Sequence, residues 1–338
     1  MAERLYAPTL APPVELAGAT DTVADRAGGL VERYGGRRYD SLGEILDDDG
    51  VDIVVVLTPH DTHETIARTS LRAGKHVFCE KPLALTHEGA RSLVSLAHER
   101  GVRLGAAPST FLGEAQQTAR KLIREGRLGR LRLGYAEVNW GRIESWHQAP
   151  EPFYEAGPLF DVGVYPLTVL ASMLGPARRA RGYGTILMPE RETLDGRRFE
   201  VRTPDFGVSL IEFDDVLVRL TTNFYVGHHN RQKGIELHGD DASLHTSWYT
   251  FNQPVEVAPF DGGYEPVAFV AEPYPGVELA RGLNEMAGAI LAGRPHRASG
   301  EQAAHVVEII CAVGESWSNG GEWVPVASTF PPVAPPYA

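Results

Sequence analysis

The stretch KHVFCEKPLALT, residues 75–86, decides the fold of the first part of this chain. It contains a short apolar strand, His76–Cys79, then the turn EKP at 80–82, and then Thr86, which suits the start of a helix. Lysine is seldom buried without a purpose, and ligands of α/β domains bind beyond the carboxyl ends of the strands. We therefore expect Lys81 to reach a ligand site, although a lysine stem that only packs at a strand end fits the same pattern.

Strands and helices alternate on both sides of this stretch. The β-branched run Asp52–Leu57 suits a strand that is covered on both faces, as in a parallel sheet. Ser41 and Glu44 have the spacing of a capping box. The pattern predicts strands at 14–19, 52–57, 76–79 and 102–106, and helices at 25–34, after Ser41, at 64–73 and at 86–100. This alternation predicts an α/β class fold with a Rossmann-like, doubly wound domain at residues 1–106.

The pattern changes from about residue 107. Several strand-like runs are joined by tight turns such as Asp214-Asp215, which indicates an open, mainly antiparallel sheet backed by helices. We expect strands at 131–140, 207–213, 216–223 and 234–238, and helices at 116–125, 157–174, 278–291 and 301–317. The interpretation is an α+β domain at 107–330, followed by a proline-rich tail at 331–338 that extends along the surface.

Composition excludes several classes of function. The 44 acidic residues against 32 basic ones disfavour a nucleic-acid partner, since phosphate binding needs clustered lysine and arginine. Cys79 and Cys311 have no metal spacing, and no histidine pair of a metalloenzyme occurs, so we expect no metal and read Cys79 as a core thiol. No run reaches ~18 apolar residues, so we expect no membrane span. The first residues lack a signal-peptide pattern, which favours a cytoplasmic location.

A set of short motifs resembles one oxidoreductase family, that of glucose–fructose oxidoreductase, inositol dehydrogenase and MocA (Gfo/Idh/MocA). The motifs are Thr58-Pro59, His63, GKH at 74–76, EKP at 80–82, GPLFDVGVYP at 157–166 and PHRASG at 295–300. Together they cover essentially the whole chain. The resemblance implies an enzyme that transfers hydride between NAD(P) and a hydroxyl or carbonyl carbon of a sugar, a cyclitol or a derivative.

The resemblance also implies the catalytic residues. Lys81 would be the catalytic lysine, and Asp161 and Tyr165 would complete a polar cluster at the nicotinamide. Many family members have histidine at the position of Tyr165, but tyrosine also donates and accepts a proton. Because four residues make about one helical turn, Asp161 and Tyr165 can share one face. Helix-start and packing roles for these two residues remain alternatives.

Further contacts complete the expected site. Cofactor contacts would come from Asp21, Thr58, Pro59, His63, Glu80 and Lys81. Asp21 favours NAD over NADP, since a carboxylate pairs with a ribose diol and repels a phosphate, but NADP stays possible. Substrate contacts would come from Trp146, His147, Asp161, Tyr165 and His228. By family analogy the protein would be a homodimer or homotetramer.

The glycine-rich turn of such enzymes is missing. A G-x-G-x-x-G turn between the first strand and helix normally holds the pyrophosphate, and this chain has none; its first ten residues look like the helix that follows the turn. Three explanations stay open: a longer natural protein, a real loss, or a different pairing that fills the gap. We expect weak NAD(H) binding. The alternative functions are a ligand-binding protein and a non-redox lyase or isomerase that uses Lys81 and Tyr165 as acid and base.

Overall fold

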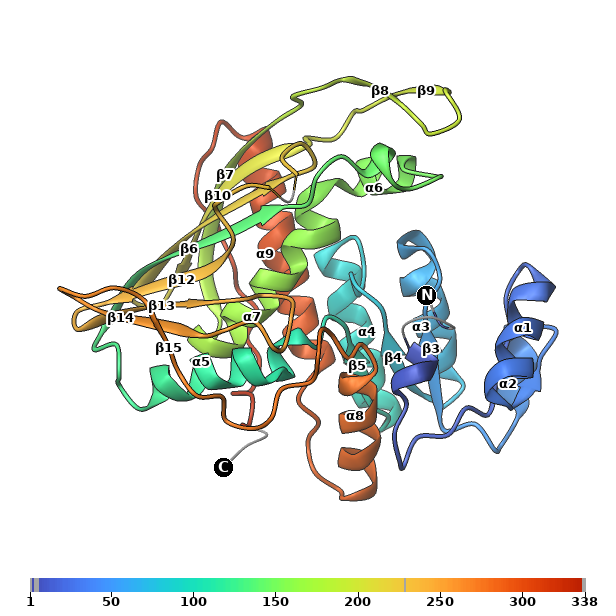
Figure 1. Ribbon diagram of the computed structural model, residues 1–338. Coiled ribbons are helices and arrows are strands. Elements are labelled where there is room, and N and C mark those ends of the chain that lie inside the picture. Colours follow the sequence, from blue (N-terminus) through green and yellow to red (C-terminus); the bar gives the residue numbers. More distant parts are fainter. Residues whose placement is uncertain (1, 3–5, 228, 336–338) are drawn as a thin grey trace. The chain divides into compact units, whose positions relative to one another are not determined.

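The computed structural model describes residues 2, 6–227 and 229–335, and it divides the chain into two compact units (Figure 1). Unit 1 comprises Met1–Ser109 and Glu278–Ala304, and unit 2 comprises Thr110–Val277 and His305–Ala338. The expected domains 1–106 and 107–330 differ from these units in one main respect, because residues 278–304 join the first unit. Backbone pairing explains this: the Ala106 N–H donates to the Ala298 carbonyl at 3.1 Å.

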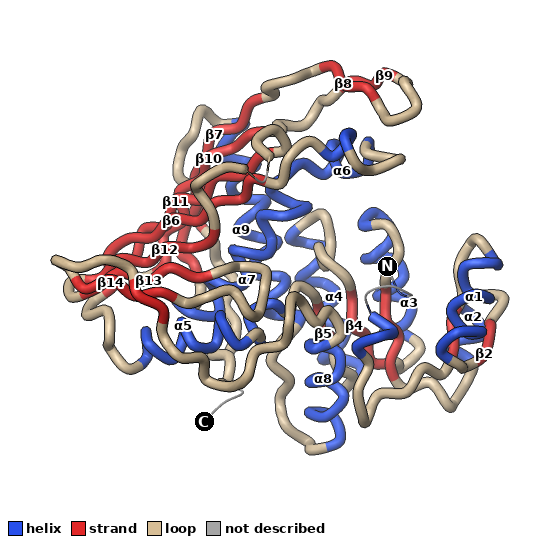
Figure 2. The backbone as a smooth tube through the Cα atoms, viewed as in Figure 1, coloured by secondary structure: helices blue, strands red, loops and turns tan. Residues whose placement is uncertain are grey.

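Unit 1 contains two separate parallel sheets (Figure 2). One pairs β1 (Gly18–Ala19) with β2 (Arg37–Arg38), and the other has the order β3 (Ile53–Val56), β4 (His76–Cys79), β5 (Leu104–Ala106). The strands expected at 52–57, 76–79 and 102–106 are confirmed. The strand expected at 14–19 shrinks to Gly18–Ala19.

The two sheets of unit 1 are separated where the doubly wound plan places its first strand. In the strand order 3-2-1-4-5-6, the strand that leads into the glycine turn lies between strands 2 and 4. Here β2 and β1 take positions 3 and 2, and β3, β4 and β5 take positions 4 to 6. Among the described residues, no strand pairs with the second edge of β1 or of β3. A different pairing therefore does not fill the gap in this part of the chain.

Two helices of unit 1 begin at the caps that the sequence predicts, whereas the helix expected at 278–291 begins at Arg281, three residues after its expected start. The Ser41 hydroxyl accepts from the Glu44 N–H at 3.2 Å, and the Thr86 hydroxyl accepts from the Gly89 N–H at 3.0 Å. The helices are α1 (Ala24–Tyr34), α2 (Leu42–Asp47), α3 (His63–Arg72), α4 (His87–Arg100) and α8 (Arg281–Leu291), with short 3₁₀ turns at Ala7–Thr9 and His60–Thr62. Cys79 is fully buried, and burial raises the pKa of its thiol well above the usual value. The prediction of a core thiol is confirmed.

Unit 2 is built on one nine-stranded sheet with the order β15-β14-β13-β12-β6-β11-β10-β7-β16. Only β6 and β11 pair in parallel, so the sheet is mainly antiparallel, as expected. Its strands are β6 (Leu131–Asn139), β7 (Ala177–Thr185), β10 (Phe206–Phe213), β11 (Val216–Asn223), β12 (Gly234–Gly239), β13 (Ala242–Thr246), β14 (Glu256–Pro259), β15 (Glu265–Pro266) and β16 (Val324–Pro325). The hairpin of β8 (Glu190–Glu192) and β9 (Arg198–Glu200) forms a separate small sheet.

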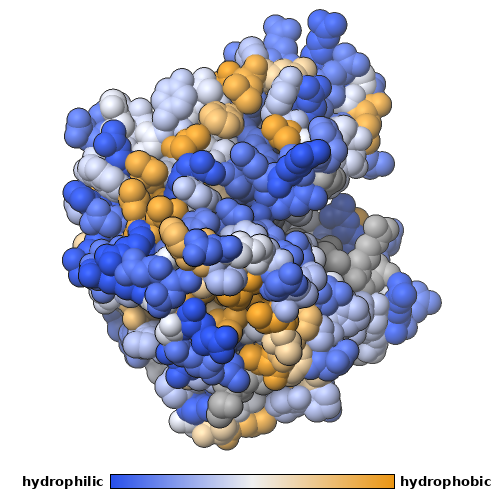
Figure 3. All heavy atoms as spheres, turned by 60° about the vertical axis from the view of Figure 1, so that its left-hand side comes forward, coloured by the Kyte–Doolittle hydropathy of each residue, from blue (hydrophilic) through white to orange (hydrophobic). Residues whose placement is uncertain are grey.

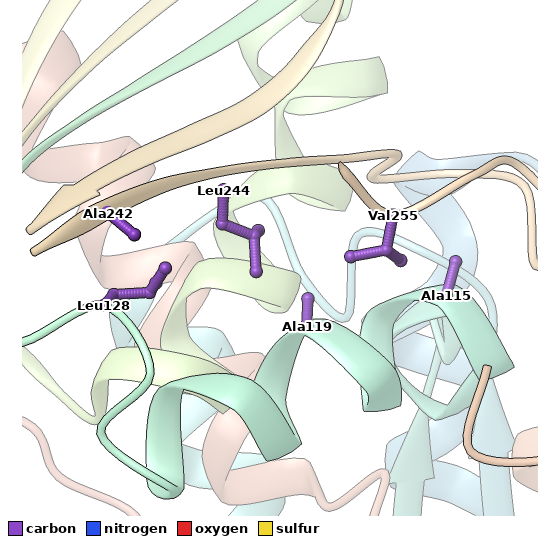
Figure 4. Close-up of a cluster of buried hydrophobic side chains, with 6 residues drawn as sticks. All are labelled: Ala115, Ala119, Leu128, Ala242, Leu244 and Val255. Atoms are coloured by element: carbon purple, nitrogen blue, oxygen red, sulfur yellow. The ribbon is translucent and has the colours of Figure 1, made fainter. Parts of the chain in front are cut away.

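Helices cover one side of this sheet, namely α5 (Glu114–Arg124), α7 (Val164–Leu174) and the part of α9 (Gly300–Ser318) that belongs to unit 2 (Figures 1 and 2). The α5 helix packs its alanines against β13, as Figure 4 shows. The buried cluster consists of Ala115, Ala119, Leu128, Ala242, Leu244 and Val255. Small side chains on α5 allow the helix to lie close to the strand.

The proline-rich tail is attached to unit 2 at one buried residue, while Pro331, Pro332 and Ala334 are exposed. Val333 is only 7% exposed, and its carbonyl accepts a hydrogen bond from the buried guanidinium of Arg120. The tail expected at the surface is exposed at three of its five described residues, and Val333 is the buried exception. The physical reason is that an arginine buried on α5 needs an acceptor.

One stretch, Glu151–Leu174, is long and apolar enough to cross a membrane by length and composition alone. Of its most apolar window, 78% is buried inside the structure, as in the core helix of a globular protein.

On the face drawn in Figure 3, apolar residues lie among polar ones. Phe260, at 85% exposure, is the most exposed of the large apolar side chains described.

A buried arginine ties three segments of unit 2 together. Arg191 on β8 is 2% exposed; its Nη1 donates to Glu144 Oε1 at 2.7 Å, and its Nη2 donates to Asp205 Oδ2. The Tyr154 hydroxyl donates to the other Glu144 oxygen, and the Arg191 guanidinium lies 4.5 Å from the Tyr154 ring centroid. Burial, and then the bond to Glu144, raise the pKa of Tyr154. One cation thus balances two buried carboxylates.

Replacing Arg191 by methionine should lower the free energy of unfolding by about 3–5 kcal/mol, because two buried carboxylates lose their cation. Urea denaturation measures this. The control is Arg198→Met on β9, where the guanidinium is 79% exposed and lies 3.8 Å from Glu192; it should cost less than about 1 kcal/mol. Equal losses in the two variants would contradict the assignment of Arg191 as an anchor.

Two partly buried histidines of unit 1 have ring nitrogens that lie within hydrogen-bonding distance of the backbone. His76 Nδ1 accepts from the Arg103 N–H at 2.8 Å, and His296 Nε2 lies 3.0 Å from the Leu104 carbonyl. Burial lowers the pKa of both imidazoles. The unfolded chain, with a histidine pKa of about 6.5, then binds more protons than the folded chain. The contribution of these two histidines to the free energy of unfolding is therefore fully present above the unfolded pKa and falls as the pH drops below that value.

We expect urea to unfold the protein at a lower concentration at pH 5 than at pH 7.5. The double variant His76→Asn, His296→Gln should reduce this difference, because Asn supplies an acceptor near Nδ1 and Gln a donor near Nε2 without titrating. The exposed His229, changed to Gln, should leave the difference intact. A double variant as acid-sensitive as the wild type would show that other groups cause the effect.

Candidate active site

The turn after β4 holds Lys81 by means of a buried carboxylate. Glu80 is 4% exposed; its Oε2 accepts from the Lys81 backbone N–H at 2.9 Å, and its Oε1 accepts from the Tyr6 hydroxyl at 2.6 Å. Lys81 is half-buried at the carboxyl end of the strand. Sequence reasoning missed Tyr6. This tyrosine lies 74 positions before Glu80 in the chain, and no local pattern indicates that the two residues meet.

The end of β3 lies beside this turn, since β3 and β4 are neighbouring parallel strands. Thr58 and Pro59 are exposed there. His63 is 1% exposed; its Nδ1 lies 2.8 Å from the Pro82 carbonyl and its Nε2 lies 2.9 Å from the Thr58 carbonyl. Both ring nitrogens thus connect the two strand ends. The structure brings together five of the predicted cofactor residues: Thr58, Pro59, His63, Glu80 and Lys81.

Asp21 lies in the other sheet of unit 1, after β1, and is exposed. Its Oδ1 accepts from the Val23 N–H at 2.8 Å, just before α1, and lies 3.9 Å from Arg26 Nη1. The carboxylate therefore shapes the start of α1.

In unit 2, Asp161 and Tyr165 lie on a helix that is interrupted. The helix expected at 157–174 is confirmed from Pro158 onward, but it is not a regular α-helix: Gly157, with φ 75°, kinks α6 (Glu151–Pro158), and a π turn at Leu159–Gly163 precedes α7. Asp161 is part of this π turn, and Tyr165 is in the first turn of α7. Such wide turns recur at functional sites. Both side chains are half-buried.

Tyr165 belongs to a group of four aromatic side chains, which we call the aromatic group: Trp140, Tyr165, Trp248 and Tyr249. The ring centroid of Tyr165 lies 5.3 Å from that of Tyr249 and 6.0 Å from that of Trp248. Sequence reasoning missed the other three members, which follow β6 and β13. Only the Trp-Tyr pair at 248–249 is a local signal, and a pair of aromatics is more often a packing element.

Trp146 and His147 form a different aromatic contact. The Trp146 ring is 51% exposed and lies 5.6 Å from the His147 ring, which itself lies 4.8 Å from Phe153. The preceding 3₁₀ turn, Ile143–Ser145, contains Glu144, so the Arg191 anchor fixes the base of this loop. His228 lies outside the described residues. Within the part of the chain that the structure describes, no group of three or more potential ligands is arranged to hold a metal ion.

Two family models match the chain. One, described as an oxidoreductase family with an NAD-binding Rossmann fold, matches residues 2–107, and the other, the GFO/IDH/MocA C-terminal domain, matches residues 116–245. The chain is 32% identical over 236 residues to a 1,5-anhydro-D-fructose reductase of Ensifer adhaerens, which covers 68% of this chain and 67% of that enzyme.

A second relative is more distant. A trans-1,2-dihydrobenzene-1,2-diol dehydrogenase of Macaca fuscata fuscata is 29% identical over 182 residues, 52% of this chain and 50% of that enzyme. The match thus spans about half the length of that relative. A levoglucosan dehydrogenase in complex with NADH and levoglucosan has the same fold, with a TM-score of 0.81 at 20% identity, covering 95% of this chain and 94% of that one. The chain belongs to the GFO/IDH/MocA family of NAD-binding dehydrogenases and reductases.

Proposed function

We propose that this protein transfers hydride between NAD(H) and a hydroxyl or carbonyl carbon of a sugar, a cyclitol or a derivative. The observation that carries the proposal is the turn after β4, where buried Glu80 holds the backbone of Lys81 at a strand end. Ligands of α/β domains bind at this edge of the sheet. The names of the relatives, which are sugar and diol oxidoreductases, support the substrate class.

In this proposal Lys81 exchanges a proton with the substrate oxygen. When the substrate hydroxyl is oxidised, its proton passes to the lysine amine, and the reverse transfer protonates the carbonyl oxygen during reduction. Tyr165 donates to or accepts from the same substrate, and Asp161 orients a neighbouring hydroxyl. The nicotinamide, when bound, supplies or accepts the hydride. General acid–base assistance of this kind contributes about 10²–10⁴ in rate.

Trp146 and His147 are proposed as further substrate contacts. A half-exposed indole can stack on the apolar face of a sugar, and the neighbouring imidazole can hydrogen-bond to a hydroxyl. The ion pair of Glu144 with Arg191 holds the start of this loop. A contact from His228 stays a prediction from the sequence.

The described residues fit the two ends of the dinucleotide better than its middle. Asp21 suits the adenosine ribose diol, which favours NAD over NADP, and the strand ends at Thr58 and Lys81 suit the nicotinamide side. No G-x-G-x-x-G occurs in the sequence, and the two sheets of unit 1 part where the strand before that turn belongs. The backbone N–H groups that normally surround a pyrophosphate thus have no counterpart in the described part of unit 1.

This split favours a second candidate function. A member of the family with weak dinucleotide binding would act as a binding protein for a sugar-like ligand, or as a non-redox lyase or isomerase with Lys81 and Tyr165 as acid and base. A homodimer or homotetramer, formed through the open face of the large sheet, and a cytoplasmic location stay proposals by analogy and composition.

We expect the chain to bind NADH weakly, with a dissociation constant above the micromolar range, because the pyrophosphate lacks its turn. Titration calorimetry measures this, with levoglucosan dehydrogenase titrated in parallel as a binding control. Micromolar binding by this chain would contradict the expectation and would favour the redox function over the second candidate.

Lys81→Met should lower turnover at least about a hundredfold while the fold is kept, because only the proton-exchanging group is lost. Absorbance at 340 nm follows the reaction with a panel of sugars and cyclitols at millimolar NAD or NADH. Lys121→Met, at an exposed site on α5, is the control and should be as active as the wild type. Turnover that survives in Lys81→Met removes Lys81 from the mechanism.

A further inference from the structure

We propose that the aromatic group of unit 2 is a platform on which a cyclic sugar or cyclitol stacks its C–H face, and that it selects ring-shaped over open-chain polyols. The proposal deepens the proposed function and rests on it for the substrate class. It assigns a specificity role to Trp140 and Tyr249, which no sequence motif marks.

Three distant segments build the platform. Trp140 follows β6, Tyr165 starts α7, and Trp248 and Tyr249 follow β13. Trp140 lies 6.1 Å from Trp248 and 6.0 Å from Tyr249, between ring centroids, and Trp248 lies 5.7 Å from Tyr249. With the two contacts of Tyr165, five of the possible ring pairs are in contact. Edge and tilted contacts of this kind hold aromatic rings in place.

Burial within the group is uneven. Trp248 is 8% exposed, and its Nε1 donates to the Glu137 carbonyl at 3.0 Å, so this ring is the fixed base. Trp140, Tyr165 and Tyr249 are each half-buried. On α7, the neighbours of Tyr165 at 164 and 166–172 are all buried. These three rings keep part of their surface accessible, which stacking of a ligand requires.

The chemistry of the group suits a sugar ring. Aromatic faces carry partial negative charge, and the axial C–H bonds of a β-glucopyranose ring make each of its two faces apolar and slightly positive. The hydroxyls of Tyr165 and Tyr249, together with Asp161 on the adjacent π turn, supply the polar groups that orient a ligand in an otherwise aromatic site. An open-chain polyol has no such flat face and loses more conformational freedom on binding.

The experiment measures binding without the dinucleotide. Methyl β-D-glucopyranoside, a locked ring, and D-glucitol, its open-chain counterpart, are titrated against the full chain, and tryptophan fluorescence reports binding because Trp140 and Trp248 belong to the platform. Tyr249→Ala should weaken glucoside binding at least about tenfold and glucitol binding less than about twofold. Tyr249→Phe, which keeps the ring, should stay within about threefold of the wild type.

Phe260→Ala is the matched control, since Phe260 is an exposed aromatic elsewhere in unit 2. Circular dichroism checks each fold, and Trp140→Leu replaces Tyr249→Ala if that variant does not fold. Equal losses for the two probes, or no saturable signal from the glucoside with wild-type protein, would overturn the platform. If the platform holds but Lys81→Met does not reduce turnover, the redox proposal fails and this one stands.

Discussion

The proposed chemistry depends on one buried carboxylate. Glu80 sits almost out of contact with water, where an unsatisfied polar group costs about 1–3 kcal/mol and a charged group more. It meets this requirement with the Tyr6 hydroxyl and the Lys81 backbone N–H. The backbone of the turn that carries Lys81 is therefore held from inside the domain. A reactive group gains precision when its supports are buried and satisfied.

Unit 2 uses the same device on a larger scale. Arg191 compensates Glu144 and Asp205 in the interior, and these ion pairs join the turn before Trp146, the β8–β9 hairpin and the residue that precedes β10. The groups that we assign to substrate lie next to buried residues: Trp146, which is 51% exposed, follows the turn that contains Glu144, and Tyr165 is the one partly accessible side chain at 164–172 of α7. Ligand contacts and supports are thus separate residues.

The split between the sheets of unit 1 sets the limit of the redox interpretation. Parallel sheets keep their backbone groups satisfied when each inner strand has partners on both edges. Here β1 and β3 each have one partner strand among the described residues. The edge that each leaves unpaired is the edge where the doubly wound plan requires the strand that leads into the phosphate turn. Within unit 1, Thr58 and Lys81 follow neighbouring strand ends, whereas the described residues of this unit include no strand that would lead into a phosphate turn.

The sequence by itself determined the class of both units, the helix starts at Ser41 and Thr86, and the strand ends that carry Thr58 and Lys81. These features are local: they depend on apolar periodicity, on caps and on short motifs. Only the tertiary structure decided the Tyr6–Glu80 bond, the π turn that carries Asp161, the burial of Arg191 and the aromatic group. Each of these joins segments far apart in the chain or depends on a backbone irregularity. Local sequence patterns do not indicate which distant residues come into contact.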